Sequence, residues 1–159
     1  MNSLGLKNKI SLSIARLMRM SLLLLLLAVT VSCGGDSTDT RRPEENLWEV
    51  VSYFNGQALV SPLSGTQLTL QLSLDEQASG SAGCNTFNSS ATLDGNSITF
   101  GPIATTRMIC DQPDGVMDQE SAYLAALQGT AGYAITGNQM EFTDENQNVQ
   151  VRFETKDDF

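Results

Sequence analysis

The apolar positions of residues 67–74 repeat at every second residue, which is the period of a β-strand. Four leucines alternate there with polar side chains: Leu68, Leu70, Leu72 and Leu74. This pattern predicts a strand with one face on a core and the other in solvent. Residues 47–54 begin a similar strand, in which we expect Trp48, Val50 and, after a twist, Phe54 to face the core.

The same period recurs in short segments that are separated by turn residues such as Asn55-Gly56 and Gly137-Asn138. The other expected strands are residues 78–82, 87–93, 97–100, 103–108, 133–136, 139–143 and 149–153. Residues 57–63 form a short strand or a loop. Since some of these short segments could belong to one strand or to a loop, we predict seven to nine antiparallel strands.

Residues 116–128 have the spacing of a helix. Their apolar stripe consists of Met117, Ala122, Tyr123, Leu124 and Leu127. Asp118 and Glu120 favour the N-terminal end of this helix through its dipole, and Gly129 is a plausible stop. We predict a mainly β (β-rich α+β) fold, a small antiparallel barrel, closed or cracked, with one helix packed at one end.

The N-terminus has a different pattern, in which basic residues precede an apolar run. The run, residues 20–31, is shorter than the roughly 20 residues that span a membrane. A small residue, Ser32, then stands before Cys33, which is the lipobox pattern of bacterial lipoproteins. We predict a lipoprotein signal peptide over residues 1–32 and acylation of Cys33 by chains such as palmitate. The alternative is ordinary secretory cleavage that leaves Cys33 as a free thiol.

The chain after Cys33 divides into two parts. Residues 33–46 offer no apolar side chain to a core and are expected to form a flexible tether. Residues 47–155 form the predicted folded domain. The residue after Cys33 is Gly34 and not Asp. This resembles the pattern that directs lipoproteins of enteric bacteria to the outer membrane. We therefore expect a lipid-anchored envelope protein, held at the outer membrane and facing the periplasm.

Charge removes one class of partner. The chain has 9 basic and 18 acidic residues, and losing the four basic residues of the leader leaves five against 18, a net charge of −13. Such a chain repels phosphate backbones, so we expect no binding to nucleic acid. Anionic headgroups repel it as well, so membrane attachment depends on the acyl chains.

Two cysteines, Cys84 and Cys110, remain in the predicted domain. If they pair, they close a loop of about 27 residues, which stabilises the fold by roughly 3–4 kcal/mol in the chain-entropy model. Export would provide the oxidising conditions for a disulfide, which we predict. Buried free thiols are the alternative. A metal site would be short of ligands because the chain has no His, and the C-x-x-C spacing of catalytic thiol pairs is missing.

The residues around these cysteines carry a family resemblance. The motif G-x-x-G-C-N-x-F at residues 80–87 is followed by T-T-x-M-x-C at residues 105–110. With Trp48 and the helix pattern Glu120-x-x-Tyr123-Leu124-x-x-Leu127, the sequence resembles the META domain family, which includes HslJ-like bacterial heat-shock lipoproteins. The resemblance implies a small barrel and makes these the family motif residues: Gly83, Cys84, Asn85, Thr106, Met108 and Cys110.

Few catalytic groups are available. Without His, the common nucleophilic triads and zinc sites have no base or ligand, and we expect no enzyme activity, metal or cofactor. Two alternatives rest on carboxylates. Two carboxylates could act as general acid and base in a hydrolase. Calcium could bind to the oxygens of Asp111, Asp114 and Asp118, or to those of Asp144 and Glu145.

These observations and the resemblance together suggest a non-enzymatic interaction or stress-response module of the cell envelope. We expect it to be a monomer and to bind another envelope protein. The alternative is a pilotin-like barrel that binds an apolar ligand or the apolar tail of a partner. That alternative needs an open interior. A core filled by Leu68, Leu70, Val151 and the helix stripe would count against it.

Overall fold

The computed structural model describes residues 42–155, so the predicted signal peptide, Cys33 and most of the predicted tether lie outside the described residues. Ten antiparallel strands form one sheet within the described range. They are β1 (Leu47–Phe54), β2 (Leu59–Val60), β3 (Thr69–Ser73), β4 (Gln77–Ser81), β5 (Thr86–Asp94), β6 (Ser97–Phe100), β7 (Ala104–Thr105), β8 (Gly132–Thr136), β9 (Gln139–Thr143) and β10 (Val149–Glu154).

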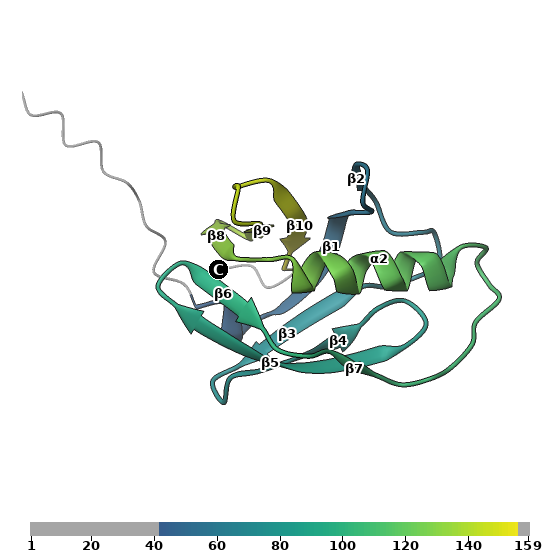
Figure 1. Cartoon of the computed structure of the whole chain (residues 1–159), viewed down its shortest axis with the longest axis horizontal. Helices are drawn as coiled ribbons and strands as arrows, with labels where there is room; N and C mark the ends of the chain where they lie inside the picture. The colour runs from purple at the N-terminus through teal and green to yellow at the C-terminus, as the bar shows by residue number, and fades with distance from the viewer. Residues whose placement is uncertain (1–41, 156–159) are drawn as a thin grey trace, which may run out of the picture. The chain divides into compact units, whose positions relative to one another are not determined.

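Eight of these strands close into a barrel (Figure 1). The order around the ring is β1-β3-β4-β5-β6-β8-β9-β10, and β10 pairs back with β1. The short strands β2 and β7 lie off the ring, where they pair with β1 and β5. The join between β6 and β8 is the narrowest, because only Ser97 and Gly132 pair there. The prediction of a small, closed, mainly β barrel with one helix is confirmed.

A β-bulge changes which residues of β1 face the core. The register against β10 shifts between Val50 and Ser52, so one extra residue interrupts the alternation. Trp48 and Val50 are buried as predicted, and Tyr53 takes the next inward position. Phe54 is only partly buried, so the expectation that it faces the core is wrong.

The helix α2 spans Val116–Gln128, the bounds predicted from the sequence. It ends at Gly129, whose N–H donates to the carbonyl oxygen of Ala125 at 2.9 Å. The helix packs against β1, β10 and β6 and lies across the barrel (Figure 1). Within residues 42–155, no helix combines the length and the apolar character that crossing a bilayer requires.

Apolar side chains fill the barrel interior. Leu70, Val151 and Leu127 have no exposed surface and belong to one core cluster. Tyr123 of α2 is also fully buried, and its hydroxyl donates to the carbonyl oxygen of Thr69 at 3.1 Å. Burial raises the pKa of Tyr123 well above its ordinary value, so the phenol remains a proton donor. Tyr123 and Leu127 of the predicted helix stripe therefore meet the leucines of β3 in the same core, whereas Met117 is only partly buried and lies outside this cluster.

The start of the folded domain and the end of β3 differ from the sequence-based expectation. Pro43–Glu45 form a short 3-10 helix, η1, and the indole Nε1 of Trp48 donates to the carbonyl oxygen of Pro43 at 2.7 Å. Because Asn46 is also buried, the folded domain begins before Leu47 and includes the end of the predicted tether. Leu74 is 73% exposed, since β3 ends at Ser73 and the chain turns there.

Candidate functional site

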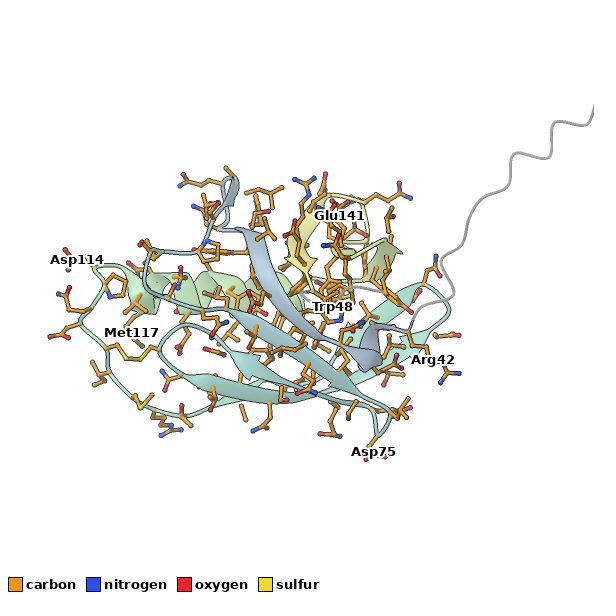
Figure 2. All side chains as sticks on the ribbon, turned by 180° about the vertical axis from the view of Figure 1, so that it is seen from behind. Arg42, Trp48, Asp75, Asp114, Met117 and Glu141 are labelled. Atoms are coloured by element: carbon orange, nitrogen blue, oxygen red, sulfur yellow. A yellow bond between two sulfur atoms is a disulfide. The ribbon has the colours of Figure 1, made fainter. Side chains whose placement is uncertain are left out.

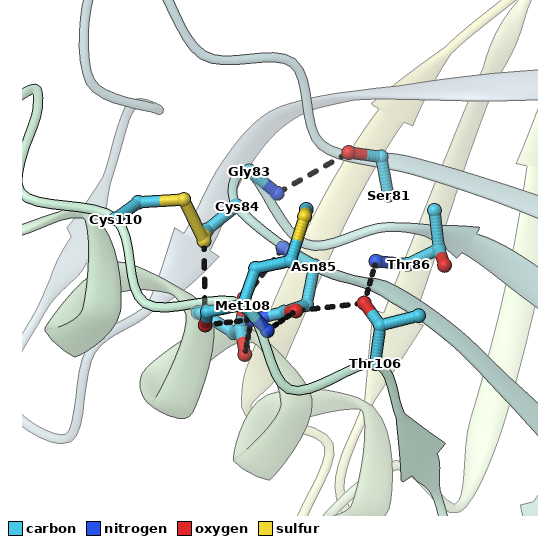
Figure 3. The surroundings of a disulfide bond; sticks show 9 residues. Ser81, Gly83, Cys84, Asn85, Thr86, Thr106, Met108 and Cys110 are labelled. Carbon is cyan, nitrogen blue, oxygen red and sulfur yellow. Dashed lines mark hydrogen bonds between the residues drawn. A yellow bond between two sulfur atoms is a disulfide. The ribbon is translucent and has the colours of Figure 1, made fainter.

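The six motif residues come from two segments and meet beside the N-terminal part of α2 (Figure 3). One segment is the turn between β4 and β5, which carries Gly83, Cys84 and Asn85. The other is the loop of residues 106–115 between β7 and α2. A disulfide joins the two segments through Cys84 and Cys110, with their Cα atoms 6.0 Å apart. The predicted pairing is therefore present.

The side chain of Asn85 holds the loop as a strand partner would. Its Oδ1 accepts hydrogen bonds from the Thr106 hydroxyl at 2.7 Å and from the backbone N–H of Met108 at 2.8 Å. Its Nδ2 donates to the carbonyl oxygen of Met108 at 3.1 Å and to the Glu120 carboxylate at 3.0 Å. A primary amide has two donors and two lone pairs, and here all four are used. We call Asn85, Thr106, Met108 and Glu120 the Asn85 clasp.

Glu120 is the buried charge of the clasp. Its side chain comes from α2 and the residue is only 7% exposed. The backbone N–H of Asn85 donates to Oε2 at 2.9 Å, and Nδ2 reaches both carboxylate oxygens. A buried carboxylate is costly without such donors. Glu120 was expected only to favour the helix N-terminus, and its family spacing to Tyr123 was the one signal of a tertiary role.

Glycine is required in the turn that carries Asn85. Gly83 has φ 102°, a left-handed conformation, and a Cβ there would lie 2.8 Å from Nε2 of Gln119. At Gly80, a Cβ would collide with the carbonyl oxygen of Thr69 on the neighbouring strand. The bend at Gly83 and the close approach of Thr69 to Gly80 therefore both require glycine. They allow the chain to reverse and direct Asn85 toward α2.

Gln119 performs a similar task for a second loop, and no sequence pattern pointed to this role. This residue is 3% exposed and precedes Glu120 on α2. Its Oε1 accepts from the backbone N–H of Leu63 at 2.6 Å, and its Nε2 donates to the hydroxyl of Thr66 at 3.0 Å. Two consecutive polar residues of the helix thus fasten two different loops to the same end of the barrel.

The segment after β7 is a loop where a longer strand was predicted. Only Ala104 and Thr105 pair with β5, so the expectation of a strand over residues 103–108 is wrong beyond them. The Asn85 side chain binds the backbone of Met108 instead, and Met108 itself is 54% exposed. The Cys84 Sγ lies 3.7 Å from the Met108 carbonyl oxygen, a contact only, because a disulfide sulfur carries no proton.

The acids considered for calcium do not gather into a metal site among the described residues. Both oxygens of Asp144 accept hydrogen bonds within its own turn, from Asn146, Asn148 and Gln150. The hydrogen bonds from Asn148 hold the pKa of Asp144 below its usual value. Among residues 42–155, no group of three or more acidic, Cys or His side chains is arranged to hold a metal ion. The geometry therefore gives the calcium alternative no support.

The described surface also has open depressions. One of about 230 Å³ lies over β1, β8, β9 and β10, where Arg152 Nε is 2.7 Å from a carboxylate oxygen of Glu141. These two side chains are about half exposed, at 50% and 40%, and Glu141 marks the place in Figure 2. This depression lies on the outside of the barrel, so it does not provide the interior space that an enclosed apolar ligand would need.

Comparisons with known proteins support the family resemblance that the motif indicated. The META domain family matches residues 43–157. A solution structure of a protein from Burkholderia xenovorans is 27% identical, with a TM-score of 0.58 over 72% of this chain and 83% of that one. A crystal structure of a duf4847 family protein from Bacteroides vulgatus shares the fold at 12% identity, with a TM-score of 0.53 over 72% of this chain and 96% of that one. No curated protein matches.

Proposed function

We propose that this chain, which belongs to the META domain family, is a lipid-anchored protein of the bacterial cell envelope that acts as a non-enzymatic interaction module in stress tolerance. In this proposal, acylated Cys33 holds the barrel at the outer membrane, in the periplasm. The domain binds an envelope protein and is itself monomeric. The HslJ-like character of the motif is compatible with the family.

The observation that carries the proposal is the Cys84–Cys110 disulfide. Three cysteines are present in the chain, and the disulfide uses both of those in the folded domain. Cys33 is then left beside an apolar leader, as a lipoprotein requires. Stable disulfides are typical of exported proteins and rare in the cytosol. The thiol chemistry of the whole chain therefore supports export followed by anchoring.

The geometry of the Asn85 clasp favours binding over catalysis. Glu120 is the buried carboxylate of the site, and both its oxygens accept hydrogen bonds from Asn85. A paired-carboxylate hydrolase needs a second carboxyl group at about 5–10 Å on the other side of a substrate. In the clasp, the polar groups of Asn85 instead form hydrogen bonds that hold the loop of residues 106–110 in place.

The pilotin-like alternative loses support from the filled interior. Leu68 is 1% exposed, and Leu70 and Val151 are fully buried in the core cluster with α2. A ligand inside the barrel would have to displace these side chains, and a close-packed interior has few voids larger than a water molecule. Binding at an outer surface requires no such change.

A deletion strain tests the proposed function. Loss of the protein is expected to lower survival under heat and envelope-active drugs, and the full-length gene restores it. A gene with Cys33→Ser should fail to restore it, and mass analysis of the wild-type protein should find acyl chains on Cys33. Equal survival of the deletion strain under every stress, or a wild-type protein that retains residues 1–32 in the cytoplasm, would refute the proposal.

A further inference from the structure

The loop after β7 presents apolar side chains at its tip. Ile109 is 94% exposed and Met108 is 54% exposed. Among the large exposed apolar residues of the described domain, Ile109 is the most exposed, and these two are adjacent in sequence. A single exposed apolar residue is ordinary. Two neighbours on a fixed backbone are not explained by the packing of this domain.

The backbone of this tip is held on both sides. The Asn85 side chain binds the N–H and the carbonyl oxygen of Met108, and the disulfide anchors Cys110 to Cys84. Ile109 lies between these two fastenings. A loop that is ordered before binding avoids the entropy loss that weakens flexible binding segments. The clasp thus has a consequence beyond stability, because it pre-organises an exposed apolar side chain.

A cation accompanies the apolar pair. Arg107 is exposed, and no carboxylate among the described side chains lies within ion-pair distance of it. Arg152, by contrast, pairs with Glu141. Arginine is one of the residue types in which binding hot spots are enriched. We call residues 107–109 the loop tip.

The geometry points to the loop tip as a docking site for a protein that offers an apolar socket with a carboxylate at its rim. Ile109 would fill the socket and Arg107 would pair with the carboxylate. The inference rests on the proposed interaction function and names the surface and the partner chemistry for it. Backbone pairing is not the mode, because the Met108 N–H and carbonyl are already bonded within the domain.

A protein partner fits better than a lipid surface. Asp111 and Asp114 follow the loop tip in the same loop and are exposed, so anionic headgroups would be repelled there. Arg42 and Asp114 lie at opposite ends of the domain (Figure 2). The loop is therefore remote from the end at which the tether joins, whereas a membrane-anchoring surface would be expected near it.

Site-specific photo-crosslinking in cells tests the inference. The full chain with its own leader carries p-benzoylphenylalanine in place of Ile109 or, as the matched control, in place of Leu74, which is also apolar, exposed and in a turn. We expect one protein adduct from position 109 that position 74 does not form. Arg107→Glu should reduce its yield at least about tenfold, as for loss of an interface hot spot, and Arg107→Lys should retain most of it.

Other outcomes overturn the inference. These are no adduct at position 109, an adduct with lipid or with a second copy of the chain, the same adduct from position 74, or a yield that Arg107→Glu leaves unchanged. Equal thermal unfolding midpoints of the variants serve as the folding control. If Ile109→Asp restores stress survival to the deletion strain as well as wild type does, the loop tip is refuted while the proposed function stands.

Discussion

Replacing Asn85 by Ala is the sharpest test of how the motif supports this fold. The change removes the amide that joins Glu120 of α2 to the backbone of Met108. It leaves Glu120 buried with only the backbone N–H of residue 85 as a donor. It also leaves the Thr106 hydroxyl and the Met108 backbone without their partner. The disulfide still holds Cys110, so the loop is loosened and not released.

The expected cost follows from the bonds that are lost. A hydrogen bond to a charged group contributes about 1.5–3 kcal/mol and a neutral one about 0.5–1.5 kcal/mol. The Asn85 side chain makes one of the first kind and three of the second. Water reaches the exposed side of the loop and offsets part of the loss, so we expect a destabilisation of about 3–5 kcal/mol. For a domain of this size, that lowers Tm by about 12–20 °C.

Urea unfolding of the oxidised domain, followed by Trp48 fluorescence, measures this cost. Asn88→Ala is the matched control, since Asn88 is an exposed residue of β5, and it should change the free energy of unfolding by less than about 0.5 kcal/mol. A double-mutant cycle with Glu120→Ala should give a coupling of about 1–3 kcal/mol. A loss below about 1 kcal/mol for Asn85→Ala, or additive effects with Glu120→Ala, would refute the reasoning.

Three further predictions concern the same loop and one distant turn. Replacing Cys84 and Cys110 by Ser should lower the free energy of unfolding by about 3.5 kcal/mol, the loop-closure value for their separation of 26 residues; equal urea midpoints for the variant and the oxidised wild type would contradict this. Gly83→Ala should cost about 1–3 kcal/mol, because the left-handed φ is unfavourable for Ala and its Cβ would crowd Gln119; an unchanged Tm would rule out that strain. The pKa of Asp144 is lowered in the folded state, so its contribution to stability is present above the ordinary value of 3.8 and is lost as pH falls through the folded pKa. A carboxyl NMR titration should find its midpoint below 3.8, and a midpoint at or above that value would show the turn hydrogen bonds to be ineffective.

The sequence-based predictions held best where neighbours in the chain decide the structure. The bounds of α2 were predicted from local apolar spacing and Gly129, and they agree with the structure. The leucines at 68, 70 and 72 alternate as β3 requires and are buried. The disulfide was predictable because the domain has only two cysteines, which leaves one way to pair them.

The predictions failed where an element ends or a distant residue intervenes. Leu74 continues the alternation in sequence, but the strand stops one residue earlier and its side chain is exposed. Phe54 lost its inward position to Tyr53 through a bulge whose register is set by β10, about a hundred residues later in the chain. Residues 43–46 look like tether by composition, yet Trp48 binds the Pro43 carbonyl and orders them.

Local properties follow from the sequence alone: strand and helix periods, turns, charge, and an N-terminal segment with the pattern of a lipoprotein leader. The pairing of buried polar groups depended instead on the tertiary structure. Glu120 on an isolated helix would be one more solvated acid. It becomes the buried anchor of the motif because barrel closure places it against Asn85, 35 residues away in the sequence. Hydrophobic period specifies which face of an element is buried, whereas the partner of a buried polar atom depends on how distant elements are brought together.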